Sequence, residues 1–100
     1  MIMPRRAARV DSNQGEIVSA LRQMGCSVVS LAAVGKGVTD LLVGVSGKNL
    51  LIEVKDGSRP PRARKLTPDQ VIFHAEWRGQ IAKAESVDDA IRIVNESRRT

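Results

Sequence analysis

Three charged residues lie on either side of a short turn, where a β-hairpin would bring them together. Asp40 precedes the dipeptide Ser46-Gly47, and Glu53 and Lys55 follow it. If the hairpin is centred on this dipeptide, residues whose numbers sum to about 93 face each other, so Asp40 lies opposite Glu53. Lys55 shares the face of Glu53, because side chains alternate along a strand. The spacing therefore predicts two carboxylates and an ammonium group in one patch.

These groups are the ones that metal-assisted hydrolysis of a phosphodiester requires. Carboxylates directly opposite each other on paired strands have Cβ atoms about 5 Å apart and repel unless a cation lies between them. Mg²⁺ prefers oxygen ligands and uses one or two carboxylates together with water and substrate phosphate. A nearby lysine can stabilise phosphate charge or orient the attacking water. We therefore expect Asp40 and Glu53 to bind the metal and Lys55 to assist the reaction.

A simpler interpretation is a surface ion pair between Glu53 and Lys55, with Asp40 as a polar residue at a strand end. Exposed pairs of this kind are common and contribute little to stability. We favour the metal site because long apolar runs flank the turn and predict a central hairpin, where three charged groups without a purpose would be costly. A loop with an odd number of residues would shift the register by one and move Asp40 off this face.

The elements that must position this patch follow from cap residues, glycines and apolar periodicity. The hairpin strands, over 39–45 and 48–55, place one apolar face in the core: Leu41, Val43, Val45, Leu50, Ile52 and Val54. The other predicted elements are a helix from 11–13 to Gly25, a strand over 26–31, a basic loop over 56–66, a helix from Thr67 to Gly79, a strand over 80–85, and a helix from Ser86 that buries Ala90, Ile91 and Val94. The predicted order is αβββαβα, an α/β domain.

The composition limits the class of protein and its partners. The chain has 100 residues, 42% hydrophobic and 27% charged, which is typical of a single globular domain over residues 1–100. Lys and Arg number 16 and Asp and Glu 11, for a net charge of +5, so a polyanion is the expected partner. The single cysteine, Cys26, excludes an internal disulfide. Because His74 is the only histidine, a metal would have to be held by oxygen ligands. No apolar run approaches the roughly 20 residues of a membrane span, and we expect a cytoplasmic protein.

Basic residues near the predicted site are candidates for contacts with nucleic acid. Lys36 lies in a glycine-flanked loop, and Arg62, Arg64 and Lys65 precede the second helix. For each residue alone a solvated loop position is the commoner role, but together they could neutralise several phosphates. The basic stretch 1–10 is expected to be a flexible arm.

The two aromatic residues narrow the expected kind of nucleic-acid recognition. Phe73 and Trp77 are too few for the stacking platforms of single-strand binders, so structured nucleic acid is the better fit. Their spacing of four residues on one helical face favours a core or dimer contact.

The order and spacing of four motifs resemble the PD-(D/E)XK nuclease superfamily, and in particular its small VRR-NUC branch. The motifs are Glu16 in the first helix, GVTDLL over 37–42, IEVK over 52–55, and Gln70 at the start of the next helix. The resemblance implies a restriction-endonuclease-like fold with a mixed central sheet flanked by helices. It also implies a homodimeric, Mg²⁺- or Mn²⁺-dependent DNA endonuclease, with branched substrates such as four-way (Holliday) junctions.

The same resemblance implies a role for each matching residue. Asp40 and Glu53 bind the metal, the backbone carbonyl of Val54 adds a ligand, and Lys55 is catalytic. The position before the aspartate is commonly proline in the family and is Thr39 here. Because that proline shapes the backbone and supplies no ligand, we expect activity to survive the difference.

Glu16 and Gln70 have a second interpretation. Each lies three residues after a helix-cap residue, Asn13 and Thr67 respectively, and fits the capping-box pattern. Their spacing alone does not decide between cap and site, and the resemblance implies that both complete the site.

The sequence thus predicts a metal-dependent endonuclease acting on structured DNA. The alternatives are a basic module that binds structured nucleic acid without cutting it, and a protein-interaction domain whose charge serves solubility. A homodimer is expected for the nuclease, since two symmetric cuts in a junction need two related sites.

Overall fold

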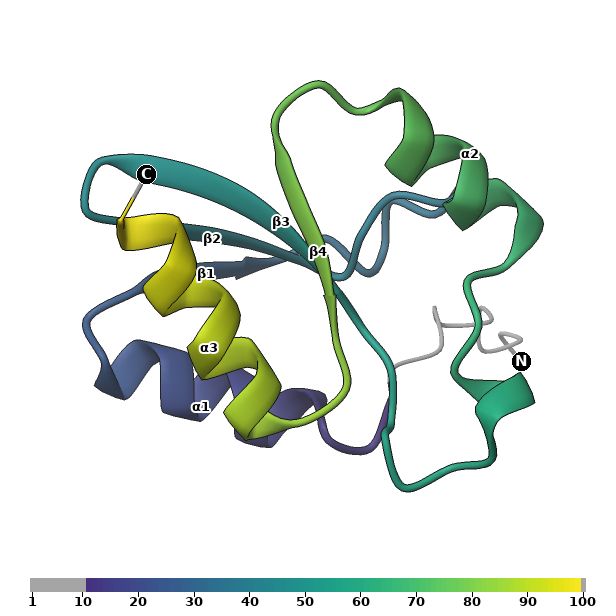
Figure 1. The fold of residues 1–100 in the computed structure, drawn as a ribbon, viewed down its shortest axis with the longest axis horizontal. Helices are drawn as coiled ribbons and strands as arrows, with labels where there is room; N and C mark the ends of the chain where they lie inside the picture. Colours follow the sequence, from purple (N-terminus) through teal and green to yellow (C-terminus); the bar gives the residue numbers. More distant parts are fainter. Residues whose placement is uncertain (1–10, 100) are drawn as a thin grey trace, which may run out of the picture.

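The computed structural model describes residues 11–99, and its elements follow the predicted order with one added 3₁₀ turn (Figure 1). The predicted arm at 1–10 lies outside these residues. The α/β class is confirmed. The elements are α1 (Gln14–Gln23), β1 (Ser27–Ser30), β2 (Leu41–Val45), β3 (Lys48–Val54), η1 (Pro61–Ala63), α2 (Pro68–Glu76), β4 (Gln80–Ala84) and α3 (Val87–Arg98).

The four strands form one mixed sheet in the order β1-β2-β3-β4. The first two pairings are antiparallel and the β3–β4 pairing is parallel. In the hairpin, Leu41 pairs with Ile52 and Val45 with Lys48. This is the predicted register, and it continues the ladder so that Asp40, just before β2, faces Glu53.

The core lies between one face of this sheet and the helices α1 and α3, which pack side by side (Figure 1). All six hairpin residues predicted for the core are buried. Ile17 and Leu21 cover them from α1, and Ala90, Ile93 and Val94 from α3. Ile93, rather than the predicted Ile91, belongs to this stripe, and Ile91 is half-buried.

The end of α2 and the start of β2 differ from the prediction by two residues or more. The helix α2 ends at Glu76 and not at Gly79, because Trp77 has an extended backbone with φ −71° and ψ 128°. The strand β2 begins at Leu41, two residues later than predicted, although the backbone N–H of Leu31 still donates to the carbonyl of Asp40 at 2.7 Å. This bond holds Asp40 at the edge of the sheet, next to the end of β3.

The helix α2 lies apart from the other two helices, near the end of the sheet where the carboxylates are (Figure 1). None of its residues is buried, and Val71 and Ile72 are more than half exposed. Phe73 stacks on Trp77 with ring centroids 5.4 Å apart, and Trp77 remains 45% exposed, so this pair is not part of the core. Within residues 11–99, no helix has the length and apolar character needed to cross a membrane.

Candidate active site

Asp40 and Glu53 lie together at the end of the hairpin, as their spacing predicts. The backbone N–H of Val54 donates to Asp40 Oδ2 at 2.7 Å, so the aspartate side chain reaches across to β3. Glu53 is 3% exposed on the sheet face opposite the core. The two carboxyl groups therefore meet in a place that water reaches poorly.

Glu53 shows the electrostatic cost of this arrangement. Its pKa is raised to about 8, first by burial and then by the charge of Asp40 and a hydrogen bond to it, whereas the Lys55 ammonium acts in the opposite direction. Its Oε1 atom is buried and has no hydrogen-bond partner among the described residues. At neutral pH the pair thus holds a proton where a cation would otherwise compensate the charge.

Lys55 and Gln70 surround the second oxygen of Glu53. Lys55 Nζ lies 3.7 Å from Glu53 Oε2, and Gln70 Nε2 donates to the same oxygen at 3.0 Å. Lys55 Nζ also donates to Gln70 Oε1 at 3.0 Å. Lys55 is only 9% exposed, which rules out the simpler interpretation of a solvated surface ion pair.

Gln70 makes the contacts of a helix cap and also contacts the residues of the candidate site. Its backbone N–H donates to the Thr67 hydroxyl, and its Oε1 accepts from the Thr67 backbone N–H at 2.8 Å, which completes the capping box. The same side-chain amide also donates from Nε2 to Glu53 and accepts at Oε1 from Lys55. The cap that starts α2 thus fixes the orientation of a site residue.

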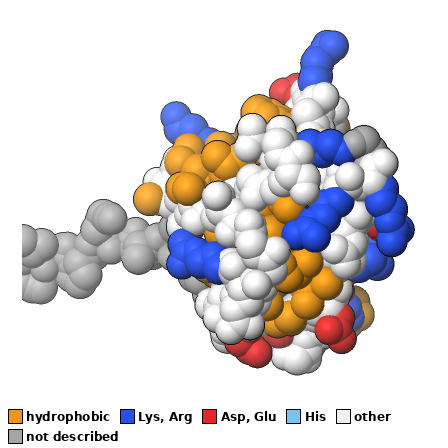
Figure 2. Space-filling model, turned by 90° about the vertical axis from the view of Figure 1, so that its left-hand side faces the viewer, with side chains coloured by type: hydrophobic (Ala, Val, Ile, Leu, Met, Phe, Trp, Pro, Cys, Tyr) orange, Lys and Arg blue, Asp and Glu red, His pale blue; other side chains and the backbone are white. Residues whose placement is uncertain are grey.

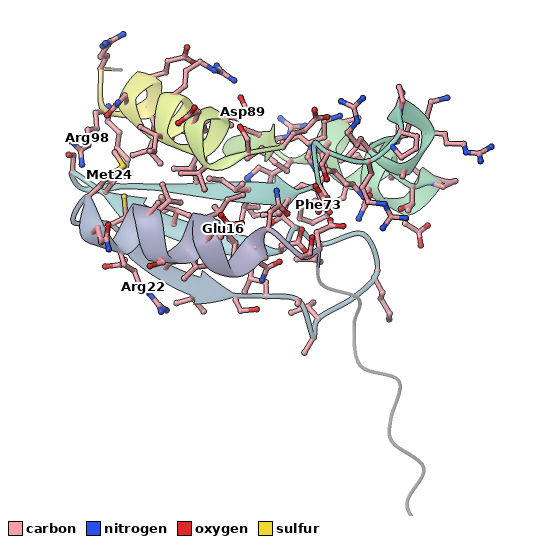
Figure 3. All side chains as sticks on the ribbon, turned by 90° about the horizontal axis from the view of Figure 1, so that it is seen from below. Glu16, Arg22, Met24, Phe73, Asp89 and Arg98 are labelled. Carbon is pink, nitrogen blue, oxygen red and sulfur yellow. The ribbon has the colours of Figure 1, made fainter. Side chains whose placement is uncertain are left out.

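Glu16 does not form the predicted capping box and makes no hydrogen bond or ion pair with Asp40 or Glu53. Asn13, at the N-cap of α1, makes no side-chain capping bond and instead donates from Nδ2 to the carbonyls of Lys55 and Glu85. Glu16 is exposed on α1 (Figure 3) and lines an open hollow with Asp56 and residues of the α3 N-terminus. The structure does not bring it to the carboxylate pair.

Among the predicted phosphate contacts, Arg64 has an acidic partner. Its Nη1 lies 3.1 Å from Glu85 Oε1, and Lys83 Nζ lies 3.2 Å from Glu85 Oε2. Lys83 pairs with Glu53 in the parallel β3–β4 register, so this cluster adjoins the site. The prediction overlooked Lys83 and Glu85, and only a known β3–β4 pairing would have pointed to them.

The other predicted phosphate contacts, Lys36, Arg62 and Lys65, are exposed. Lys36 lies between two glycines in a run of three positive φ angles, 74°, 59° and 82° over 35–37. In Figure 2, which shows the end of the molecule with the hairpin turn, Lys and Arg side chains also predominate over Asp and Glu. Positive charge is therefore not confined to the end that carries the carboxylates.

His74 lies one helical turn beyond Gln70 and is half-buried. Burial lowers its pKa first, and the charges of Lys55 and Lys83 lower it further. The lowered pKa favours the neutral imidazole at physiological pH.

The donor set fits a hard divalent cation. Asp40 and Glu53 supply two carboxylates, and the peptide of Val54, whose N–H binds Asp40, lies beside them. Mg²⁺ needs no more protein ligands than these, because water and substrate complete its shell. Across residues 11–99 no three Asp, Glu, His or Cys side chains are grouped so as to hold one ion, so any site would depend on this pair.

Gly37 determines how closely the loop before Asp40 approaches α2. A Cβ at this position would lie 2.5 Å from the carbonyl oxygen of Asp69. We expect Gly37→Ala to destabilise the fold by about 2–3 kcal/mol, the sum of a positive-φ penalty and the clash. Gly35→Ala is the matched control, because Gly35 also has positive φ but nothing within 4 Å of its Cβ position. Urea unfolding of both variants measures the difference, and equal losses would contradict the close contact.

Comparison of the chain with protein families, with curated proteins and with solved structures finds no match. What the site does must therefore be argued from its own residues and geometry.

Proposed function

We propose that the chain is a Mg²⁺- or Mn²⁺-dependent endonuclease that hydrolyses phosphodiester bonds in structured or branched DNA. The observation that carries this proposal is the pair of facing carboxylates, a half-buried Asp40 and a buried Glu53, with a lysine ammonium 3.7 Å from Glu53. A protein gains no stability from two carboxyl groups that must share a proton. Such a pair is useful where a cation replaces that proton.

Each residue of the site has a role in this chemistry. Asp40 and Glu53, with the Val54 carbonyl, would hold the ion, which supplies charge stabilisation for the phosphate and a more acidic water. Lys55 is held by Gln70 and Glu53 and can donate to a phosphate oxygen as negative charge develops there. Gln70 keeps Lys55 and Glu53 in place, and its own orientation is fixed by Thr67.

We further propose the finer fold, substrate and assembly that the resemblance implies. The fold would be of the restriction-endonuclease type, and the protein would act as a homodimer on branched DNA such as a four-way junction. The exposed Lys36, Arg62 and Lys65 support a DNA partner, since they lie in the two loops that adjoin the start of α2 and form no ion pair within residues 11–99. Dimerisation would give the two related sites that paired cuts require.

The test is incubation of the purified protein with Mg²⁺ and a panel of duplex, flap, single-stranded and four-way-junction DNA. We expect metal-dependent cleavage of at least one branched substrate. Salt-sensitive binding without cleavage in either metal would instead indicate the non-catalytic module, and absence of binding would exclude both. Light scattering on the same preparation tests the homodimer.

Lys55→Met tests the catalytic lysine directly. Methionine retains the buried aliphatic stem and removes the charge, so we expect the fold to persist and cleavage to fall by roughly a hundredfold or more. DNA affinity should change little. Lys36→Met is the control, because Lys36 is exposed and forms no ion pair with Asp40 or Glu53, and it should weaken binding modestly without a comparable loss of rate. Cleavage rates of the DNA-saturated variants provide the measurement, and a Lys55→Met protein that cuts normally would exclude this role.

A further inference from the structure

The segment before α1 is tied to the end of β3 by two side chains. Ser12 Oγ donates to Asp56 Oδ2 at 2.8 Å, and Asn13 Nδ2 donates to the carbonyl oxygen of Lys55 at 3.1 Å. The backbone of Asp11 is itself held by the N–H of Gln14. Asp11, which directly precedes Ser12, is therefore held near Lys55.

Asp11 is electrostatically coupled to the residues of the site. Its side chain is half-buried, and burial raises its pKa. The Lys55 ammonium lowers that pKa and the Asp40 carboxylate raises it. Asp11 in turn contributes to the raised pKa of Glu53. Together with the hydrogen bonds of Ser12 and Asn13, this coupling places a third carboxylate close to the site.

Once Glu53 is ionised, the carboxylates of this region outnumber the one ammonium group that pairs with Glu53. Glu53 Oε1 is buried without a hydrogen-bond partner among the described residues, and Lys55 lies on the side of Oε2. A further carboxylate beside them is unfavourable unless a cation enters. The charge of Asp11 therefore destabilises the site without a cation and stabilises the site that holds one.

We propose that Asp11 is an outer carboxylate of the cation site, which increases the affinity for a divalent ion through its charge and does not ligate the ion. The proposal rests on the proposed function, because it takes Asp40 and Glu53 as the ligands. It gives Asp11 the role that the sequence resemblance implied for Glu16. We assign Asp11 an outer role because the described residues contain no group of three such side chains placed around one ion.

The experiment is titration of the full chain with Mn²⁺ alone, by isothermal titration calorimetry at low and at high salt. We expect Asp11→Asn to weaken Mn²⁺ binding roughly tenfold, as is typical for outer-shell partners of a metal. The loss should be smaller at high salt, because screening reduces a charge effect. Asp11→Glu should restore most of the affinity. A purely structural role would instead lower the melting temperature of Asp11→Asn and would not depend on salt.

Glu16→Gln is the matched control, since it removes the same unit of charge from the first turn of α1 at an exposed position. It should bind Mn²⁺ as the wild type does. Wild-type affinity in Asp11→Asn, or an equal loss in both variants, would overturn the role of Asp11 and leave the proposed nuclease intact. A wild-type protein that binds no Mn²⁺ would reject the metal site itself, and the inference with it.

Discussion

Glu53→Gln is expected to abolish metal-dependent cleavage and, at about pH 8, to make the metal-free protein more stable than the wild type. The substitution removes a proposed metal ligand, and with it the carboxyl group whose ionisation is opposed by burial and by Asp40. The glutamine amide is nearly isosteric with the carboxyl group. Its N–H can donate to Asp40, and it has no proton that titrates in this pH range. Thermal unfolding and a cleavage assay on the same preparations measure the two effects, which should have opposite signs.

The direction of the pH dependence follows from the raised pKa of Glu53. In the folded protein this carboxyl titrates at about 8, against an ordinary value of 4.5. Between these values the folded state holds a proton that the unfolded state has released, so stability falls as the pH rises through this window. The full effect is on the order of a few kcal/mol at about pH 8, or roughly 10 °C in melting temperature for a domain of this size. Glu53→Gln should lack this part of the pH dependence.

Glu85→Gln is the control for a carboxyl group of the opposite kind. The pKa of Glu85 is lowered, first by its hydrogen bond to Lys83 and also by Arg64. Its ionised form therefore contributes stability above its ordinary pKa, and that contribution is lost as the pH falls through the lowered folded value. At about pH 8, Glu85→Gln should lower the melting temperature where Glu53→Gln raises it. A decrease in both variants would contradict the account of Glu53.

The sequence was most informative where the decisive contacts are local. The register of the hairpin follows from the two-residue turn at Ser46-Gly47 and from apolar alternation, and both are properties of adjacent segments. Asp40 and Glu53 are 13 positions apart, yet the ladder places them face to face. The site's central pair could therefore be predicted without the rest of the fold.

The sequence pattern around a helix start did not predict whether the cap side chain bonds to its own helix or to a distant strand. Thr67 and Asn13 precede their helices in the same way, and each is followed three residues later by Gln70 or Glu16. The Thr67 hydroxyl has its capping partner within reach and takes it. The longer Asn13 amide reaches two carbonyls at the ends of β3 and β4 instead, and a single helix pattern contains no information about those strands.

Residues brought in by long-range packing had no signal in the sequence. Lys83 adjoins Glu53 only through the parallel pairing of β3 with β4. Asp11 reaches the site because Ser12 and Asn13 bind the chain more than 40 positions away. The helix α2 buries none of its residues, so hydrophobic periodicity could not indicate where it packs, and its place depends on Gln70 and on the close approach at Gly37.

Addition of Mg²⁺ or Mn²⁺ is expected to offset the effect of pH on the stability of the wild-type protein. In the proposed site the ion needs Glu53 deprotonated, so binding competes with the proton on this carboxyl group. Ion binding to the folded state alone at about a hundred times the dissociation constant stabilises it by about 2.7 kcal/mol. We therefore expect the rise in melting temperature on adding the ion to be small near pH 6 and to grow towards about pH 8.5. Thermal unfolding with and without the ion measures this difference across the pH range.

Calorimetric titration at pH 7 in buffers of different ionisation enthalpy should show close to one proton released for each ion bound. With a pKa of about 8, Glu53 carries most of one proton at that pH, and an incoming cation must displace it. The release should approach zero above about pH 9, where the carboxyl group is already ionised. Glu53→Gln should neither bind the ion nor release a proton, whereas Glu85→Gln should do both as the wild type does. Binding without proton release at pH 7 would mean that the ion lies elsewhere, because a cation held by Glu53 has to displace the proton that this carboxyl group carries at that pH.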